Sequence, residues 1–247
     1  MAQDGRMRFT PRGEQKSFDI RVSIAPTYYE ENAVLRLLSD LGRAFTLDSI
    51  GLSERDYKTV AEAISKPNGM ILATGPTGSG KTTTLYAILK TLNTEYVAII
   101  TAEDPVEYSI EGITQIQVNT QTDLTFANAL RSILRQDPNI IMVGEVRDED
   151  TAKISVNAAL TGHLLLSTIH TNDAATTLPR LLEMGAKPFL IASTVNVAIA
   201  QRLVRKICEY CKVGWRPTIN DIQAMGEALA DKFKGEVDIT TCIGKSR

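Results

Sequence analysis

A glycine-rich segment that ends in a lysine and a threonine carries the strongest chemical signal in the sequence. Residues 75–82 read Gly-Pro-Thr-Gly-Ser-Gly-Lys-Thr and match G-x-x-x-x-G-K-[ST] at every required position. An apolar run at 70–74 precedes this segment and a helix-forming stretch follows it, as a phosphate-binding loop requires. Glycines let backbone N–H groups turn toward phosphate oxygens, and the helix start adds partial positive charge. The alternative is a solvated glycine-serine loop.

The same segment predicts a site for ATP and Mg²⁺. In loops of this kind the lysine reaches the β- and γ-phosphates and the hydroxyl side chain ligates Mg²⁺, which assigns these roles to Lys81 and Thr82. The predicted ATP-binding residues are Gly75, Pro76, Thr77, Gly78, Ser79, Gly80, Lys81, Thr82 and Thr83.

Hydrolysis needs carboxylates that hold Mg²⁺ or orient water. The apolar run 140–143 is followed by a glycine and Glu145, as expected of a Walker B strand, and Glu145 is a second candidate Mg²⁺ ligand. Another apolar strand ends in Glu103, Asp104 and Glu107. Ligands bind at the carboxyl ends of parallel strands, so these acids are candidates for the same site. The alternatives are an ordinary strand end with a surface glutamate and a solvated turn set by Pro105.

The sequence has two histidines, His163 and His170, and they flank one apolar strand. His170 follows the strand and is predicted to donate a hydrogen bond to a γ-phosphate. A zinc site would need further ligands nearby, and the histidine segment has no neighbouring cysteine. For His163, a structural histidine is an equally good interpretation.

Short apolar strands alternate with amphipathic helices in the centre of the chain. Ser53 and Thr125 are predicted to cap helices, because residues at helical spacing follow each of them. This alternation predicts an α/β fold with a mostly parallel sheet covered on both faces. The predicted strands are 70–74, 96–100, 140–143 and 164–166.

The two ends of the chain have a different character. Residues 18–24 and 33–38 read as strands of a piece too small to be stable alone, and residues 39–50 read as a connection. Apolar residues between 222 and 233 predict one more helix. The predicted domains are 1–50, 51–200 and 201–247.

Composition excludes several classes of protein. The 247 residues carry a net charge of −2 and 43 % hydrophobic residues, which argues against a disordered chain and against nucleic-acid binding by bulk positive charge. The N-terminus has no apolar segment typical of a signal peptide, and the apolar stretch 188–201 is shorter than the roughly 20 residues of a membrane span. Three cysteines form no disulfide framework, which favours a reducing compartment.

Four segments together resemble the secretion ATPase superfamily. Residues 75–82, 101–107, 134–148 and 161–174 are similar to its Walker A, Asp, Walker B and His boxes. The likeness is strongest to the type II secretion and type IV pilus assembly ATPases, the GspE/PilB type. The C-x-x-C pair Cys208 and Cys211 favours this branch, and residues 3–6 and 19–23 resemble the end of its PAS-like N-terminal domain.

The resemblance implies a RecA-like P-loop NTPase core preceded by part of a small β-rich, PAS-like domain. Arg21 and Arg36 lie at the positions of the arginines that complete the site, where guanidinium groups would neutralise charge on the γ-phosphate. Glu103 and Glu145 would share water activation and Mg²⁺ coordination, and His170 would contact the γ-phosphate and so sense whether it is present. No neighbouring residue in the sequence requires an arginine at either position. The alternative is therefore that both are ordinary surface residues of a strand.

The resemblance also implies a cellular role. It predicts an ATP-hydrolysing motor subunit for pilus assembly or type II secretion, working in a homo-oligomer, a hexameric ring. Its partners would be inner-membrane platform proteins and cytoplasmic adaptors, with no nucleic acid, and it would be cytoplasmic and peripherally associated with the inner membrane. Family members normally carry more sequence on both sides. One alternative is therefore a truncated nucleotide-binding module without competent hydrolysis; a DNA-translocating motor is a weaker one.

The cysteines do not make a complete zinc site. Cys208, Cys211 and Cys242 give three ligands, whereas a tetrahedral site needs four, and position 245 is lysine. Zn²⁺ at Cys208 and Cys211 is therefore not expected in this chain, and reduced thiols in an open loop are the favoured interpretation.

Overall fold

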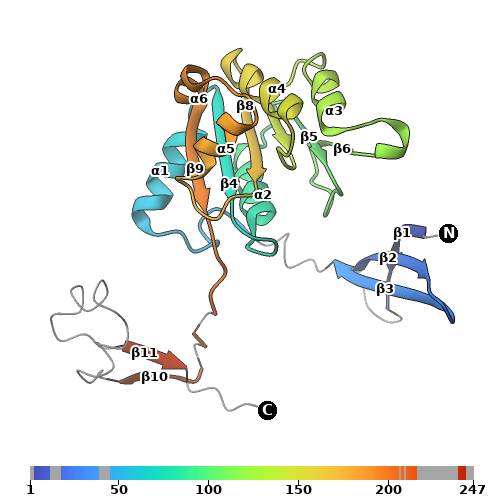
Figure 1. The fold of residues 1–247 in the computed structure, drawn as a ribbon. Helices are drawn as coiled ribbons and strands as arrows, with labels where there is room; N and C mark the ends of the chain where they lie inside the picture. The colour runs from blue at the N-terminus through green and yellow to red at the C-terminus, as the bar shows by residue number, and fades with distance from the viewer. Residues whose placement is uncertain are drawn as a thin grey trace. The chain divides into compact units, whose positions relative to one another are not determined.

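The computed structural model describes residues 3–11, 18–38, 45–205, 207–208, 210–215 and 239–242. The chain divides into two compact units, Met1–Arg202 and Leu203–Arg247, and each is described by itself. Figure 1 shows the elements along the chain.

Three antiparallel strands open the first unit: β1 (Gln3–Phe9), β2 (Phe18–Pro26) and β3 (Glu31–Leu38), in the order β1-β2-β3. The two predicted strands correspond to β2 and β3, whereas β1 is additional. Alternation along β2 buries Ile20 and exposes Arg21. Apolar Leu35 and Leu37 of β3 are exposed.

The central sheet has six strands, all parallel to their neighbours, in the order β6-β5-β7-β8-β4-β9. This confirms the predicted α/β class, because strands buried on both faces read as short apolar runs. The strands are β4 (Gly69–Thr74), β5 (Ile99–Glu103), β6 (Thr114–Gln117), β7 (Ile140–Val143), β8 (Leu164–Ile169) and β9 (Val195–Ala200).

One predicted strand is displaced along the chain. The run 96–100 was expected to form it, but β5 begins at Ile99. Val97 N–H donates to Thr94 O in a turn, and Tyr96 is 92 % exposed. The local turn therefore outweighs the apolar pattern at 96–98, and the strand extends instead to Glu103.

Helices follow most strands, and side chains mark where several begin. Ser53, Thr125 and Asp148 each accept a hydrogen bond from a backbone N–H of the first turn, which confirms the predicted caps Ser53 and Thr125. The elements are α1 (Glu54–Ile64), α2 (Lys81–Leu92), the 3-10 turn η2 (Thr120–Thr122), α3 (Phe126–Ile133), α4 (Glu149–Leu160), α5 (Thr177–Glu183) and α6 (Pro188–Thr194).

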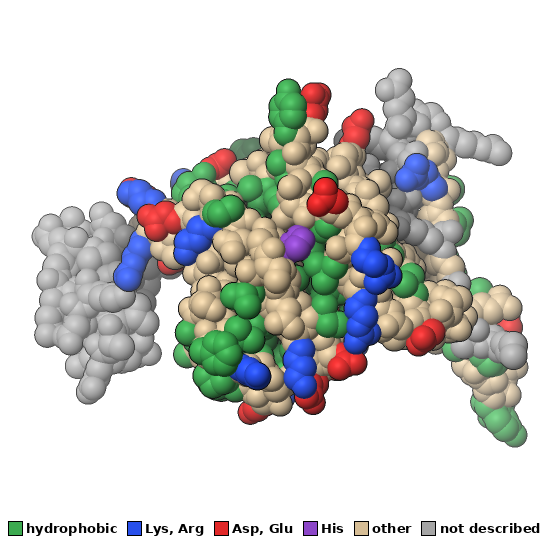
Figure 2. Space-filling model, turned by 90° about the horizontal axis from the view of Figure 1, so that it is seen from above, with side chains coloured by type: hydrophobic (Ala, Val, Ile, Leu, Met, Phe, Trp, Pro, Cys, Tyr) green, Lys and Arg blue, Asp and Glu red, His purple; other side chains and the backbone are tan. Residues whose placement is uncertain are grey.

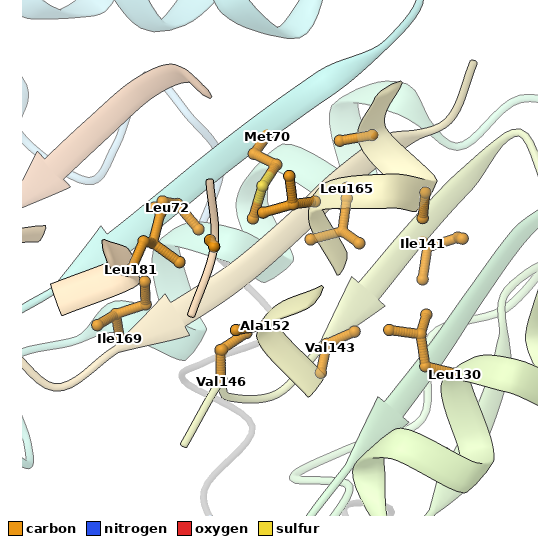
Figure 3. Close-up of a cluster of buried hydrophobic side chains, with 14 of the residues drawn as sticks. Met70, Leu72, Leu130, Ile141, Val143, Val146, Ala152, Leu165, Ile169 and Leu181 are labelled. Atoms are coloured by element: carbon orange, nitrogen blue, oxygen red, sulfur yellow. The ribbon is translucent and has the colours of Figure 1, made fainter. Parts of the chain in front are cut away.

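Two hydrophobic clusters hold the helices on opposite faces of the sheet. Met70 and Leu72 of β4 belong to the cluster that includes side chains of α3, α4, α5 and α6 (Figure 3). The alternate residues Ile71 and Ala73 belong to the cluster with α1 and α2. Successive strand side chains point to opposite faces, so β4 packs against both layers.

The described part of the second unit contains β10 (Lys212–Trp215) and β11 (Ile239–Cys242), which pair antiparallel. The helix predicted at 222–233 lies outside the described residues. Among the residues described, none of the helices has the length and apolarity that crossing a membrane requires. On the face seen in Figure 2, charged side chains of both signs are interspersed with apolar ones.

Leu72→Ala tests the packing of the central sheet. Leu72 is fully buried, so removing its side chain leaves a cavity and should lower the free energy of unfolding by about 2–5 kcal/mol. Urea unfolding followed by circular dichroism measures this loss. The exposed Leu178→Ala is the matched control and should change it by about 0.5 kcal/mol at most. An equal effect of both substitutions would contradict the assigned core.

Candidate active site

The glycine-rich loop joins the end of β4 to the start of α2. Gly75, Gly78 and Gly80 have φ values of 140°, 77° and 88°, which side chains rarely tolerate. A Cβ on Gly75 would also lie 2.5 Å from the carbonyl oxygen of Gln201. These glycines therefore give the loop a shape that other residues could not adopt.

Helix α2 begins in a way that suits an anion. No side chain caps it, and no acidic residue lies in its first turn, in contrast to α1 and α4. Its first N–H groups and its partial positive charge can therefore serve a phosphate group. Thr82 and Thr83 are half-buried in this turn, and Pro76 and Thr77 are exposed on the loop before it.

Lys81 lies across the start of the loop. Its Nζ donates to the carbonyl oxygens of Gly75 at 2.8 Å and Pro76 at 3.1 Å. Burial lowers the pKa of Lys81; the charge of Glu145 raises it and that of Arg202 lowers it. Lys81 is thus a buried hydrogen-bond donor beside the loop, and its charge interacts with one acidic and one basic side chain.

Glu145 gathers a charged cluster at the end of β7. Its Oε2 lies 2.5 Å from Nε of Arg147 and 3.1 Å from Nε2 of His170. Glu145 is nearly buried, whereas Arg147 and His170 are half-exposed or more. The structure therefore brings Lys81, Glu145 and His170 to one place, and it adds Arg147, which the sequence analysis missed although it stands two residues after Glu145.

Hydrogen bonds between the ends of β7 and β8 fix the backbone around Glu145. Ser167 Oγ donates to Val143 O at 2.7 Å, and Thr168 Oγ1 donates to Gly144 O at 2.8 Å. A Cβ on Gly144 would lie 3.3 Å from Ala102 O and 3.4 Å from the Cα of the following residue in β5. A side chain at this Walker B position would be tightly placed against β5, so the glycine eases the close approach of β7 to β5.

Glu103 lies at the end of β5 but faces other partners. It is 2 % exposed, and its carboxylate accepts hydrogen bonds from Tyr86, Thr101 and Gln115. In the part of the chain that the structure describes, no hydrogen bond or ion pair joins Glu103 to Lys81. Glu103 is thus enclosed within the protein, whereas the neighbouring Asp104 and Glu107 are exposed.

The end of β9 supports the loop from the other side. Gln201 N–H donates to Thr74 O at 3.0 Å, and its Nε2 donates to Ser79 O at 2.8 Å. Arg202 Nη2 donates to Asn172 O at 2.6 Å. The sequence analysis missed these contacts, because the local pattern gives no sign that residue 201 lies beside the loop. Their one signal is the position of Gln201 at the end of the apolar stretch 188–201.

The site fits a nucleotide and its metal ion. Within the described residues, the buried Ser79 Oγ and Gln201 Oε1 have no hydrogen-bond partner, and both belong to the loop or touch it. The Thr82 hydroxyl and the Glu145 carboxylate are hard oxygen donors of the kind that Mg²⁺ prefers. The glycine loop, the uncapped helix and these oxygens together suit a phosphate chain with Mg²⁺.

Arg21 and Arg36 lie in the N-terminal sheet. They are directly opposite each other on β2 and β3, and both are exposed. Arg6 of β1 holds the register position opposite Arg21. Like charges directly opposite each other destabilise a sheet, and an anion near the row would relieve this.

The cysteine pair offers an incomplete zinc site. Cys208 is half-buried and Cys211 is exposed. Backbone N–H groups of Cys211 and Tyr210 lower the pKa of Cys208, and the Cys211 side chain adds to this. Cys242 is paired in register with Lys212, beside Cys211. Among the described residues there is no group of three His, Cys, Asp or Glu side chains that could hold a metal ion.

A glycine loop between a buried parallel strand and a helix, with its lysine near a strand-end glutamate, defines a P-loop nucleotide-binding protein. The family model described as "Type II/IV secretion system protein" matches residues 1–244. The chain belongs to this family.

Similar proteins come from secretion and pilus systems. "Type II secretion system protein E" of Pseudomonas aeruginosa is 47 % identical over 253 residues, covering 96 % of this chain and 50 % of that protein. "Type IV pilus assembly ATPase PilB" of Acinetobacter baylyi is 48 % identical over 242 residues, covering 98 % and 42 %. The chain thus spans about half the length of the curated relatives it matches.

Solved structures share the fold. The pilus retraction motor PilT with bound ADP aligns with a TM-score of 0.72 and 34 % identity, over 84 % of this chain and 60 % of that one. The ATPase DotB of Legionella pneumophila aligns with a TM-score of 0.66 and 27 % identity, over 90 % and 60 %. These similarities support the RecA-like P-loop class, with β1 to β3 as part of an N-terminal domain.

Lys81→Ala tests the phosphate loop. Removing the ammonium group leaves the β- and γ-phosphates without their main cationic partner, so ATP binding should become undetectable at concentrations that saturate the wild type. Isothermal titration calorimetry with ATP and Mg²⁺ measures it. Lys58→Ala, at an exposed position on α1, is the control and should bind like the wild type. Unchanged binding by Lys81→Ala would exclude the loop as the site.

Proposed function

We propose that this chain binds Mg-ATP at residues 75–83 and hydrolyses it as a motor subunit for type IV pilus assembly or type II secretion. The observation that carries the proposal is the position of Glu145, which contacts His170 and lies within electrostatic reach of Lys81 of the phosphate loop. The relatives named as secretion protein E and pilus assembly ATPase support the choice of machine.

The residues of the central sheet divide the work of hydrolysis. The loop N–H groups and Lys81 bind the phosphate oxygens, and the Thr82 hydroxyl and Glu145 hold Mg²⁺. Bound there, Mg²⁺ would neutralise charge on the phosphate chain. His170, hydrogen-bonded to Glu145, would donate to the γ-phosphate. Glu103 shares the handling of water with Glu145.

Arginines of the N-terminal sheet would complete the site. We propose that Arg21 and Arg36 neutralise the negative charge that develops on the γ-phosphoryl oxygens, because the guanidinium group matches the geometry of a phosphate. Their opposed, exposed positions on β2 and β3 support this assignment.

The remaining assignments follow from the family. We place the domains at 1–50, 51–200 and 201–247, and the working form as a homo-oligomeric, hexameric ring. Its partners would be platform proteins of the inner membrane and cytoplasmic adaptors, so that the motor is cytoplasmic and peripherally associated with that membrane. A nucleotide-binding module without turnover is the second candidate, favoured by the enclosure of Glu103.

Glu145→Gln distinguishes the two candidates. The amide keeps the size of the side chain but not its charge, so turnover should fall by about 10²- to 10³-fold while ATP still binds. A phosphate-release assay and calorimetry measure the two effects, and the exposed Glu62→Gln on α1 is the control. Normal turnover by Glu145→Gln would remove this residue from the chemistry. ATP binding without turnover by the wild type would establish the second candidate.

Arg21→Ala and Arg36→Ala test the arginine assignment. Each removes a donor used mainly in the transition state, so kcat should fall by about 10²-fold while KM changes little. The exposed Arg55→Ala on α1 is the control. A rise in KM at constant kcat would show that the arginines contribute to binding alone.

A further inference from the structure

Three side chains from three elements converge on the carboxylate of Glu103. Tyr86, on α2, donates its hydroxyl to Oε2. Thr101 Oγ1 donates to Oε1 at 2.5 Å, and Gln115 Nε2, on β6, donates to the same oxygen at 3.1 Å. Both oxygens therefore have donors, and the direction of the carboxylate is fixed from α2, β5 and β6 together.

The burial of this group makes the donors necessary. Tyr86 is fully buried and Glu103 is 2 % exposed. Moving a carboxylate away from water is costly unless hydrogen bonds replace its hydration. Burial, followed by the charge of Glu103, raises the pKa of Tyr86, which favours the protonated hydroxyl that donates to Glu103.

Further contacts hold the donors themselves. Gln115 Oε1 accepts from Ile110 N–H at 2.8 Å, and its Nε2 also donates to Tyr108 O at 3.2 Å. The ring of Tyr108 meets that of Tyr86 edge to face, with centroids 4.8 Å apart. The loop after β5 and the rings of Tyr86 and Tyr108 thus form one packed unit around Glu103.

This unit connects the phosphate loop to both acids. Tyr86 stands five residues after Lys81 on the helix that begins at the loop. Gly144 N–H donates to Ala102 O at 2.7 Å, beside Glu103, and Glu145 follows directly. A change in the direction of the Glu103 side chain would therefore disturb the backbone that carries Glu145.

We propose that Tyr86 and Gln115 are positioning residues that fix the direction of the Glu103 carboxylate for ATP hydrolysis. The proposal rests on the ATPase function proposed above and adds to it two residues that act through Glu103 rather than on the nucleotide. A purely structural hydrogen bond would contribute to folding but would leave the kcat of the folded enzyme unchanged.

Tyr86→Phe separates the two roles. Loss of the hydroxyl removes the donor to Oε2 of Glu103, so the carboxylate is no longer held from α2. At neutral pH, kcat should fall by about 10- to 100-fold because the acid is less well placed, while KM for ATP changes little.

A second measurement does not depend on turnover. Carbon-13 NMR of protein labelled at the glutamate carboxyl carbons records the chemical shift of Glu103 at neutral pH, with Glu103→Gln identifying its signal. This chemical shift should differ in Tyr86→Phe, because the carboxylate loses a hydrogen-bond donor. Tyr57→Phe is the matched control, because the hydroxyl of Tyr57, which lies on α1, also bonds to a carboxylate, that of Asp48. It should leave kcat and the Glu103 chemical shift unchanged.

The outcomes are distinct. If the kcat of Tyr86→Phe coincides with that of the wild type, even with a lower melting temperature, the bond is structural and the proposal is wrong. If the wild type shows no turnover but the Glu103 chemical shift changes in Tyr86→Phe, ATP hydrolysis by this chain is rejected while the orientation of Glu103 by Tyr86 is retained. Should Tyr86→Phe not fold, Gln115→Met, which removes the other long-range donor, should show the same fall in kcat and the same change in chemical shift.

Discussion

In the central sheet every strand runs in the same direction as its neighbours, and the candidate site depends on this one constraint. Parallel pairing places the carboxyl ends of all six strands at a common edge. The phosphate loop follows β4, and the acids, the histidine and the supporting glutamine end the other strands. If a single strand were antiparallel, its side chains would lie at the far edge. The residues that this edge brings together are Gly75, Glu103, Glu145, His170 and Gln201.

The two acids at this edge lie in different electrostatic surroundings. The start of α2 and Lys81 make one region positive, and Glu145 lies within its reach together with His170 and Arg147. Glu103, one strand away, is surrounded by neutral donors instead. One acid is therefore paired with exposed basic side chains, and the other is held by neutral hydrogen-bond donors. This difference in surroundings gives two carboxylates on adjacent strands different chemical properties.

Local patterns predicted the elements that depend on neighbouring residues alone. The loop 75–82, the strand at 140–143 and the caps Ser53 and Thr125 depend on residues within a few positions of each other. Strand β1 was missed, because its residues are mostly polar and it is held by antiparallel pairing with β2.

Contacts between distant residues could not be read from the sequence. Tyr86 meets Glu103 across 17 positions, and Gln201 meets Ser79 across 122. Nothing in the local spacing of these residues distinguishes them from ordinary helix and strand-end side chains. Glu103 was identified as a functional acid from its place after a strand, but its enclosure depends on which residues of α2 and β6 lie next to it, and this is a property of the packed fold.

The hydrogen bonds of Gln201 have a mechanical consequence. The polypeptide leaves the central sheet at this residue, which is bonded to Thr74 just before the glycine loop and to Ser79 within it. Traction on the segment that follows Arg202 would therefore load the bond from Arg202 to Asn172 and then these two bonds to the loop. A phosphate chain bound in the loop and a force applied where the polypeptide leaves the sheet would thus act on the same few atoms.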